Sequence, residues 1–272
     1  MSWKLRTFSA AVLATAGMRG GSVEFDALNP AILQERLEMV SRKMAERQAT
    51  LERLFAGAGC SGENFTTQPV RGSKQPNLIC TLKGGEAGAG AIVVGGHFDL
   101  IPAGMGAVDD WSGSVLLPSL YESLKSRPRR HDYIFVAFSA EETGLNGSRA
   151  YVKELTREQR MAIRAMINLE CLGLTPPKVW ASRADRHLLE DYVRVSSALQ
   201  VEPAAMNVER VGDDDSHSFR DANIPTLSIH SLTQQTFPIL HSSRDKVSAI
   251  HMDDYYTAYR LAATLLAYLD SE

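Results

Sequence analysis

Acidic residues and histidines gather where strand-like segments of the 272-residue chain end. One hydrophobic run ends in GGHFD, residues 95–99, and the alternation of an extended chain points His97 and Asp99 the same way. An aspartate in this position can hold the second ring nitrogen of a metal-bound imidazole. A second run, DYIFVAFSA, leads directly into Glu141 and Glu142. Charged residues that follow a buried strand mark a site at that edge of an open α/β sheet.

Three more segments carry groups of the same kind. Asp109 and Asp110 precede a helix-like stretch, where a single aspartate would be an ordinary helix cap. Glu170 lies in the largely apolar run AMINLECL, where a buried carboxylate needs a cation or hydrogen bonds. His241 follows FPIL in a loop before the last helix-like segment, where a lone histidine is ordinarily a surface residue.

Taken together, these residues have the chemistry of a metal site. Imidazole and carboxylate ligands in combination suit Zn²⁺ and related borderline cations. Five such ligands would crowd one ion, whereas two ions about 3.5–4 Å apart that share a carboxylate could use all of them. A site of this type lowers the pKa of a bound water and polarises a carbonyl, while a free carboxylate beside it moves the proton.

The elements that must position these groups alternate between strand-like and helix-like runs. This alternation predicts an α/β domain with a central, mixed and mostly parallel sheet, flanked by helices on both faces. The strands at 91–98 and 133–140 are nearly continuous hydrophobic runs and are expected at the centre of the sheet. The periodicity from Asn29 to Ala58 predicts one long amphipathic helix.

Composition excludes several classes of partner. The chain has 29 Lys and Arg against 32 Asp and Glu, so its formal net charge is −3. There is no basic excess to neutralise nucleic-acid phosphates or anionic lipid. No run approaches the roughly 20 apolar residues of a membrane span.

The amino-terminal residues have some features of a signal peptide. Lys4 and Arg6 precede a mildly apolar run, and ATA at 14–16 has the form of a cleavage site. We expect residues 1–16 to be a leader, residues 17–272 to form the domain, and the protein to be exported to the periplasm or beyond. An ordinary helix in a cytoplasmic protein is the alternative. In an oxidising compartment Cys60 and Cys80 could pair, whereas in the cytoplasm both would be small buried side chains.

Five segments between residues 91 and 270 resemble a known family in their order and spacing. GGHFD, VDDWSG, EETGLNGSRAYV, INLECLG and ILHSSRD are similar to the metal-site motifs of the co-catalytic di-zinc aminopeptidases of metallopeptidase family M28. That family also contains glutamate carboxypeptidases and glutaminyl cyclases. The resemblance implies a three-layer αβα zinc-exopeptidase fold and two Zn²⁺ ions per chain.

The resemblance also implies a role for each residue of the motifs. Asp109 would bridge the two zinc ions, Glu141 would be the general acid/base, and Asp99 would be the partner of His97. The peptide bond after the bridging aspartate would be cis. The expected zinc ligands are His97 and Glu170 for one ion, Glu142 and His241 for the other, and Asp109 for both.

Some residues depart from the family pattern. Glu170 stands where the simplest bacterial aminopeptidases have Asp, although relatives also use Glu. Leu240 occupies a place where some members carry a Tyr that polarises the scissile carbonyl and glutaminyl cyclases carry Trp. In GDDDSHSF, residues 212–219, Asp215 is favoured over His217 as the residue packed beside the site. Cys171 follows Glu170 along the strand and is expected to face away from the metals.

The function expected from these residues is hydrolysis of N-terminal peptide bonds by a metal-bridging hydroxide, on peptides with a free N-terminus. The motifs do not separate an aminopeptidase from a carboxypeptidase or dipeptidase. Glutaminyl cyclisation, with one zinc and no attacking water, is the rival reaction on the same fold. A non-catalytic binding module is a further alternative, disfavoured because all five ligands and Glu141 are present.

Overall fold

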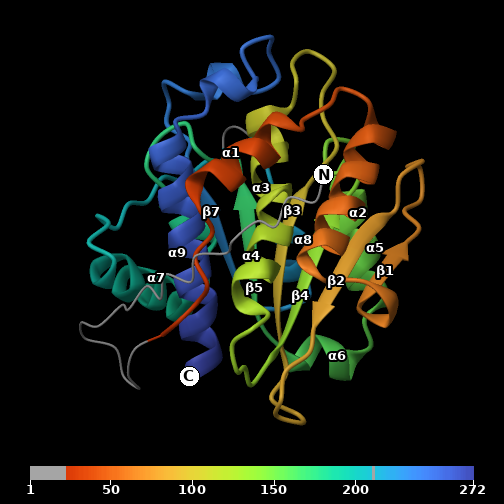
Figure 1. Cartoon of the computed structure of the whole chain (residues 1–272), viewed down its shortest axis with the longest axis vertical. Coiled ribbons are helices and arrows are strands. Elements are labelled where there is room, and N and C mark those ends of the chain that lie inside the picture. The colour runs from red at the N-terminus through yellow and green to blue at the C-terminus, as the bar shows by residue number, and fades with distance from the viewer. Residues whose placement is uncertain (1–22, 210–211) are drawn as a thin grey trace, which may run out of the picture.

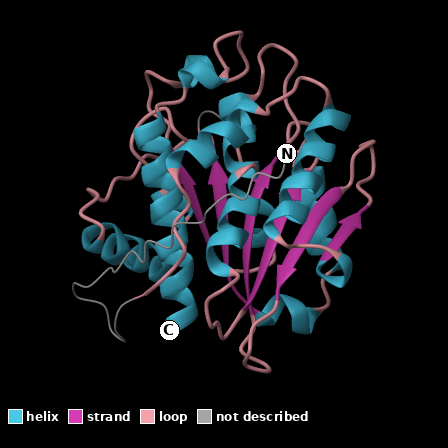
Figure 2. Ribbon diagram, in the orientation of Figure 1, coloured by secondary structure: helices cyan, strands magenta, loops and turns pink. Residues whose placement is uncertain are grey.

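A computed structural model describes residues 23–209 and 212–272, and its centre is a seven-stranded sheet (Figures 1 and 2). The strand order is β1-β2-β4-β3-β5-β7-β6. The strands are β1 (Phe65–Gln68), β2 (Asn77–Leu82), β3 (Ala91–His97), β4 (Asp132–Phe138), β5 (Ile163–Glu170), β6 (Lys178–Val179) and β7 (Thr226–His230). Neighbours among β4, β3, β5 and β7 pair in parallel, and the remaining pairs are antiparallel. The predicted single α/β domain with a mixed sheet is confirmed.

Helices cover both faces of this sheet, because its central strands are apolar on both sides. Ile92 and Val94 of β3 join the larger hydrophobic core, whereas Val93 between them joins a smaller core on the opposite face. Helices α4 and α9 lie over the larger core, and α5 and α8 contribute Tyr151 and Phe219 to the smaller one (Figure 1). The helices are α1 (Pro30–Glu38), α2 (Met44–Ala58), α3 (Ser112–Ser114), α4 (Leu116–Leu124), α5 (Asn146–Glu154), α6 (Arg157–Ala162), α7 (Arg186–Ala198), α8 (Ser216–Asp221) and α9 (Met252–Ser271).

The prediction of one long helix from Asn29 to Ala58 is wrong, because the chain forms two helices, α1 and α2, with a break between them. The side chain of Ser41 in the break accepts a hydrogen bond from the backbone N–H of Lys43 at 3.1 Å and donates one to Glu46 at 2.7 Å. Serine side chains compete with helical hydrogen bonding in this way. The break sets the direction in which α2 approaches the sheet.

A disulfide joins Cys60, just after α2, to Cys80 in β2. Helix α2 ends at Gly59, whose left-handed φ of 101° turns the chain toward the sheet. The expected leader at residues 1–16 lies outside the described residues. Among the helices of the described chain, none is long and apolar enough to cross a bilayer.

Candidate metal centre

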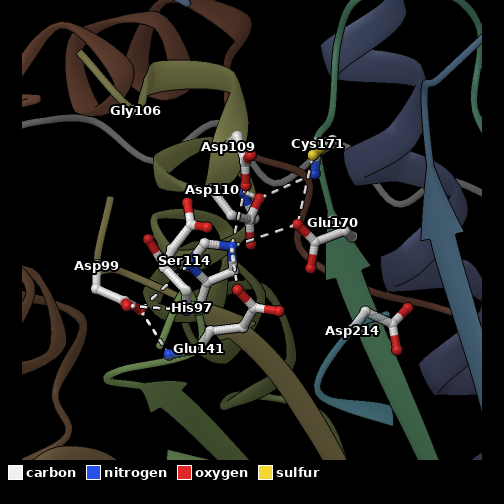
Figure 3. Close-up of polar contacts among 12 residues, drawn as sticks. His97, Asp99, Gly106, Asp109, Asp110, Ser114, Glu141, Glu170, Cys171 and Asp214 are labelled. Carbon is white, nitrogen blue, oxygen red and sulfur yellow. Dashed lines mark hydrogen bonds and ion pairs between the residues drawn. The ribbon is translucent and has the colours of Figure 1, made fainter. Parts of the chain in front are cut away.

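The five expected ligands come together at the edge of the sheet where the parallel strands end. Figure 3 shows three of them, His97, Asp109 and Glu170. His97 and Glu170 are the last residues of the neighbouring strands β3 and β5. Glu142 comes shortly after β4, while Asp109 and His241 lie in the segments that follow β3 and β7. The carboxyl ends of parallel strands meet at one edge, so residues far apart in sequence converge there.

Asp109 lies at the centre of this group and faces two histidines with two different oxygens. Its Oδ1 is 3.1 Å from His97 Nε2, and its Oδ2 is 3.1 Å from His241 Nε2. Glu170 Oε1 lies 3.4 Å from His97 Nε2, and Glu142 Oε2 lies 3.1 Å from His241 Nε2. The residues therefore form two sets, one around each histidine, that share the Asp109 carboxylate.

The spacing of the ligand atoms suits bound cations. The ligand atoms of His97, Asp109 and Glu142 all lie within 4.8 Å of one another. Those of His97, Asp110 and Glu170 meet the same limit. The structure thus adds Asp110 to the acids that face the site.

Glu141 and Asp99 lie beside the ligands. Glu141 Oε2 is 3.9 Å from His97 Nε2, so this carboxylate reaches toward the centre (Figure 3). Asp99 Oδ1 is 3.3 Å from His97 Nδ1, an ion-pair distance that lacks hydrogen-bond geometry. Asp99 also accepts the backbone N–H groups of Glu141 and Glu142 at 3.0 and 3.1 Å. Asp99 therefore faces the His97 ring and also fixes the turn that carries Glu141 and Glu142.

Two further acids fix the backbone around Asp109. Asp110 Oδ1 accepts the N–H groups of Gly113 and Cys171, both at 3.0 Å, and so ties the start of α3 to the end of β5. Asp245 accepts the N–H of Val108 at 2.7 Å. The Asp109–Asp110 peptide bond is cis, which confirms that prediction. Asp245 is not among the residues expected from the sequence, where its only signal is its place in the segment ILHSSRD.

Burial and the surplus of carboxylates raise the pKa values of several groups in the site when no cation is bound. Burial would lower the pKa of His97, but the nearby carboxylates, Glu170 foremost, raise it well above its usual value. Burial raises the pKa of Glu142 to about 7, and the Asp109 charge adds to this rise. The hydrogen bond to Asp109 raises the pKa of His241 to about 9. Burial would also raise the pKa of Asp109, but the two imidazoles outweigh it and lower that pKa.

These residues fit zinc. Two imidazole nitrogens and three carboxylates are a donor set that Zn²⁺ accepts. Glu142 Oε1 and Asp110 Oδ2 are buried without a hydrogen-bond partner in the described structure. Neighbouring buried carboxylates repel one another. A bound cation would offset this repulsion and give the unpartnered oxygens a ligand to contact.

Asp215 lies close to Glu141, whereas His217 lies in the wall of the cavity beside the site. Asp215 is fully buried, and neither of its oxygens has a hydrogen-bond partner in the part of the chain that the structure describes. The neighbouring Ser148 hydroxyl pairs with another serine instead. Burial raises the pKa of Asp215 to about 8, and its charge adds to the burial that raises the pKa of Glu141. His217 pairs with acids of its own segment, among them Asp221 at 3.1 Å.

Cys171 differs from its expected orientation. Its thiol lies 3.4 Å from Glu170 Oε1, and its Sγ groups with ligand atoms of Asp109 and Glu170. Strand β5 ends at Glu170, and Cys171 has a positive φ of 50°, so strand alternation stops before it. The prediction that Cys171 faces away from the metal ligands is therefore wrong.

A cavity of about 400 Å³ opens over the acidic groups. The described residues that line it include no tyrosine, and Leu240 stands next to His241 in its wall. His230 also lines it, and burial lowers the pKa of its imidazole to about 4. The apolar side of the cavity is formed by Leu145, Trp180, Val208, Leu232 and Leu240.

Curated proteins similar to this chain are named as aminopeptidases and related enzymes. Aminopeptidase YwaD of Bacillus subtilis is 28% identical over 69% of this chain and 41% of its own length. Leupeptin-inactivating enzyme 1 of Streptomyces exfoliatus is 29% identical over 65% of this chain and 40% of its own. The chain thus spans about two fifths of the length of these relatives.

Solved structures show the same fold. The LapA aminopeptidase of Legionella pneumophila superposes with a TM-score of 0.75 at 22% identity, over 89% of this chain and 70% of that one. A glutaminyl cyclase from an Acidobacteriales bacterium superposes with a TM-score of 0.72 at 17% identity, over 89% of this chain and 94% of that one. The sequence model of peptidase family M28 matches residues 77–266, a span that holds every expected ligand. The chain therefore belongs to peptidase family M28.

Proposed function

We propose that this chain is a zinc-dependent aminopeptidase that binds two zinc ions. The observation that carries the proposal is the position of Asp109, whose two oxygens each face a different histidine–glutamate pair. One carboxylate placed in this way can serve two cations at once. Relatives named as aminopeptidases support hydrolysis of N-terminal peptide bonds as the reaction. Because the chain spans only part of those relatives, the activity needs a direct test.

Each residue of the centre has a role in this proposal. His97 and Glu170 would hold one ion, Glu142 and His241 would hold the other, and Asp109 would bind both. Because no tyrosine lines the described cavity, the zinc ions would both lower the pKa of a water molecule and polarise the scissile carbonyl.

Glu141 is the proposed general acid/base. It lies beside His97 but outside the two sets of ligands around Asp109, so its carboxylate is free to accept a proton. It takes the proton of the attacking water and returns it to the leaving amine. Burial holds the pKa of Glu141 well above its usual value, and cations at the neighbouring ligands would lower it again. Opposing influences of this kind suit a group that must both accept and release a proton.

The cavity suits a peptide with a free N-terminus and an apolar first residue. The acidic floor around Asp109, Glu141 and Glu142 attracts a protonated amine. The apolar wall, with Trp180 and Leu232, offers contact area to a hydrophobic side chain. We expect leucyl or phenylalanyl substrates to be cleaved faster than aspartyl or lysyl ones.

Glutaminyl cyclisation is the second candidate, favoured by one observation. The superposed glutaminyl cyclase is covered over 94% of its chain, whereas the LapA aminopeptidase is covered over 70%. The superposition thus extends over nearly the whole of the cyclase chain. Leu240 counts against cyclisation, because the resemblance places a tryptophan there in cyclases.

Export is part of the proposal, and the Cys60–Cys80 disulfide supports it. Disulfides persist in oxidising compartments and are rare in cytoplasmic proteins. We therefore propose that residues 1–16 direct the chain to the periplasm or outside the cell. Fractionation of the source cells, with mass spectrometry of the mature N-terminus, tests this; an intact N-terminus in the cytoplasmic fraction would overturn it.

One substrate panel tests the reaction. The zinc-loaded protein is given leucyl-p-nitroanilide, its N-acetylated form and a peptide that begins with glutamine, each with and without chelator. We expect release from the free leucyl substrate only, loss of release with chelator, recovery with added zinc, and two zinc equivalents per chain. Cleavage of the blocked substrate alone would overturn the aminopeptidase assignment, and pyroglutamate formation with one zinc would establish the cyclase.

A further inference from the structure

Arg47 is a fully buried arginine that the proposed reaction does not use. It lies in α2, before the segment that matches the M28 sequence model, and none of its surface is exposed. Arginine is rarely buried completely unless its charge and its donors are satisfied. The partners of Arg47 therefore show what holds it there.

All hydrogen bonds of the Arg47 side chain in the described structure go to backbone carbonyls. Nε donates to Phe98, one terminal nitrogen donates to Met105 at 3.1 Å and Ser41 at 3.3 Å, and the other donates to Gly106 at 3.0 Å. The guanidinium also lies 5.0 Å from the ring centre of Trp111. The planar fork of arginine allows one side chain to reach several separate acceptors.

Three of these carbonyls, those of Phe98, Met105 and Gly106, belong to the two ends of the segment between His97 and Asp109. Phe98 stands between His97 and Asp99, while Gly106 comes three residues before Asp109. Gly106 has a left-handed φ of 59°, and a Cβ there would lie 3.3 Å from the Arg47 terminal nitrogen. One guanidinium thus fixes both the start and the end of the loop at residues 98–106.

Arg47 also brings a positive charge to the back of the acidic site. Burial lowers its pKa to about 10, while the charges of Asp110, Asp99 and other acids near the site oppose that fall. The guanidinium therefore stays protonated at neutral pH. Because it bonds carbonyls and leaves the carboxylates free, it stabilises the acidic cluster without occupying a ligand atom.

We propose that Arg47 is a positioning residue for the metal centre. By holding the carbonyls of Phe98 and Gly106, it sets the distance between His97 and the bridging Asp109. The site would then depend on a residue of α2 that lies outside the matched family segment. This inference rests on the proposed zinc function, so its test measures zinc binding as well as hydrolysis.

The test compares two substitutions on the same helix. Arg47→Met removes the donors and the charge, whereas Leu51→Ala, at another fully buried position of α2, weakens packing and removes no hydrogen-bond donor. Both variants are studied at a temperature where circular dichroism shows them folded. Zinc affinity is measured by competition with a chromogenic chelator, and kcat and KM are measured separately with leucyl-p-nitroanilide.

We expect Arg47→Met to weaken zinc binding by about ten-fold or more. Its kcat should fall while KM changes by less than about two-fold, because the substrate cavity is untouched. Leu51→Ala should lower the melting temperature and leave zinc affinity and kcat near those of the unaltered protein. Equal losses in the two variants, or wild-type zinc affinity in a folded Arg47→Met, would overturn the inference.

Arg47→Lys keeps the test decisive if Arg47→Met does not fold. Lysine retains the charge, but its single nitrogen cannot reach carbonyls as far apart as those of Phe98 and Gly106. We expect Arg47→Lys to bind zinc more weakly than the unaltered protein, and wild-type zinc affinity in Arg47→Lys would overturn the inference. An unaltered protein that bound no zinc would instead overturn the proposed function, and the inference with it.

Discussion

Two buried histidines lie at opposite ends of the sheet, and each has an aspartate beside it. His97 ends β3 and has Asp99 3.3 Å from its Nδ1, while His131 precedes β4 and has Asp270 3.1 Å from its Nδ1. Arg164 donates to the other ring nitrogen of His131 at 3.0 Å. At the His97 end, the other ring nitrogen faces only carboxylates.

The two histidines differ in how completely the hydrogen bonds and charges of the groups around them are paired. Asp270 accepts the backbone N–H groups of Arg130 and His131 as well as facing the ring, so an aspartate, a histidine and an arginine balance one another. The His97 set has a surplus of acids and unpartnered buried oxygens. The type of residue pair is the same, but only the end with the surplus of negative charge needs a cation.

The largest effect is expected from Glu141→Gln, which keeps the size of the side chain and removes its ability to take a proton. Turnover should fall by about a thousand-fold, within the range for loss of a general acid/base. Zinc content should stay at two equivalents, because Glu141 is not among the proposed ligands. Stopped assays with elemental analysis on the same preparation measure both quantities.

Glu190→Gln is the matched control for that substitution. Glu190 lies in α7 and forms solvent-exposed pairs with Arg186 and His187 of the same helix, so the same chemical change should leave turnover unaltered. Near-normal hydrolysis by fully metallated Glu141→Gln would show that another group moves the proton.

Removal of metal is expected to cost stability at the His97 end of the sheet. At a free zinc concentration about 1,000 times the dissociation constant, each site stabilises the folded protein by about 4 kcal/mol. Chelation should therefore lower the melting temperature by several degrees, and added zinc should restore it. Calorimetry with and without chelator measures this, and an unchanged midpoint would contradict a preformed zinc centre.

The sequence predicts the general fold because the signals for strands are local. Hydrophobic runs such as residues 91–98 are buried on both faces, and the helix-like runs between them must cover those faces. The break between α1 and α2 could not be predicted in the same way. It depends on the Ser41 side chain and on the carbonyl that Ser41 offers to Arg47, and helical periodicity shows neither contact.

For the site, sequence motifs predict which residues meet but not how they are held. The order of the five motifs gives His97, Asp109 and the other ligands, because the ends of parallel strands converge. The resemblance also implies that Asp109 is shared between the two histidines, and the structure adds the distances of 3.1 Å from its two oxygens to the two rings. Cys171 was placed on the wrong side because a positive φ ends the strand pattern, and Arg47 carried no signal because an arginine in a helix is ordinarily exposed.

A third buried histidine, His230, extends the comparison to pH. Its Nε2 lies 3.0 Å from the Met206 carbonyl and its Nδ1 accepts the N–H of Leu232, so the ring is neutral when folded. Burial lowers its pKa from 6.5 to about 4. As the pH falls, the unfolded chain takes up a proton on His230 before the folded protein does. The contribution of the neutral ring to the free energy of unfolding is therefore complete above about pH 6.5, and it falls by about 3 kcal/mol as the pH drops to about 4.

His230→Gln isolates that dependence, because the amide can donate to Met206 and accept from Leu232 without titrating. Melting temperatures of the metal-free protein are measured between pH 4 and 7, which separates the histidine from zinc release. The unaltered protein should lose more stability over this range than His230→Gln does. Identical slopes would show that His230 is not held neutral.

The smallest effect is expected from Asp270→Asn at the opposite end of the sheet. Asparagine retains an oxygen for the backbone donors but loses the charge that faces the His131 ring. Hydrogen bonds to a charged group contribute about 1.5–3 kcal/mol, so stability should fall by about 1–2 kcal/mol. Because this network only anchors the end of α9, zinc affinity and kcat should stay unchanged. Chemical denaturation with a zinc titration measures both, and a weakened zinc site would show that the two ends of the sheet are coupled.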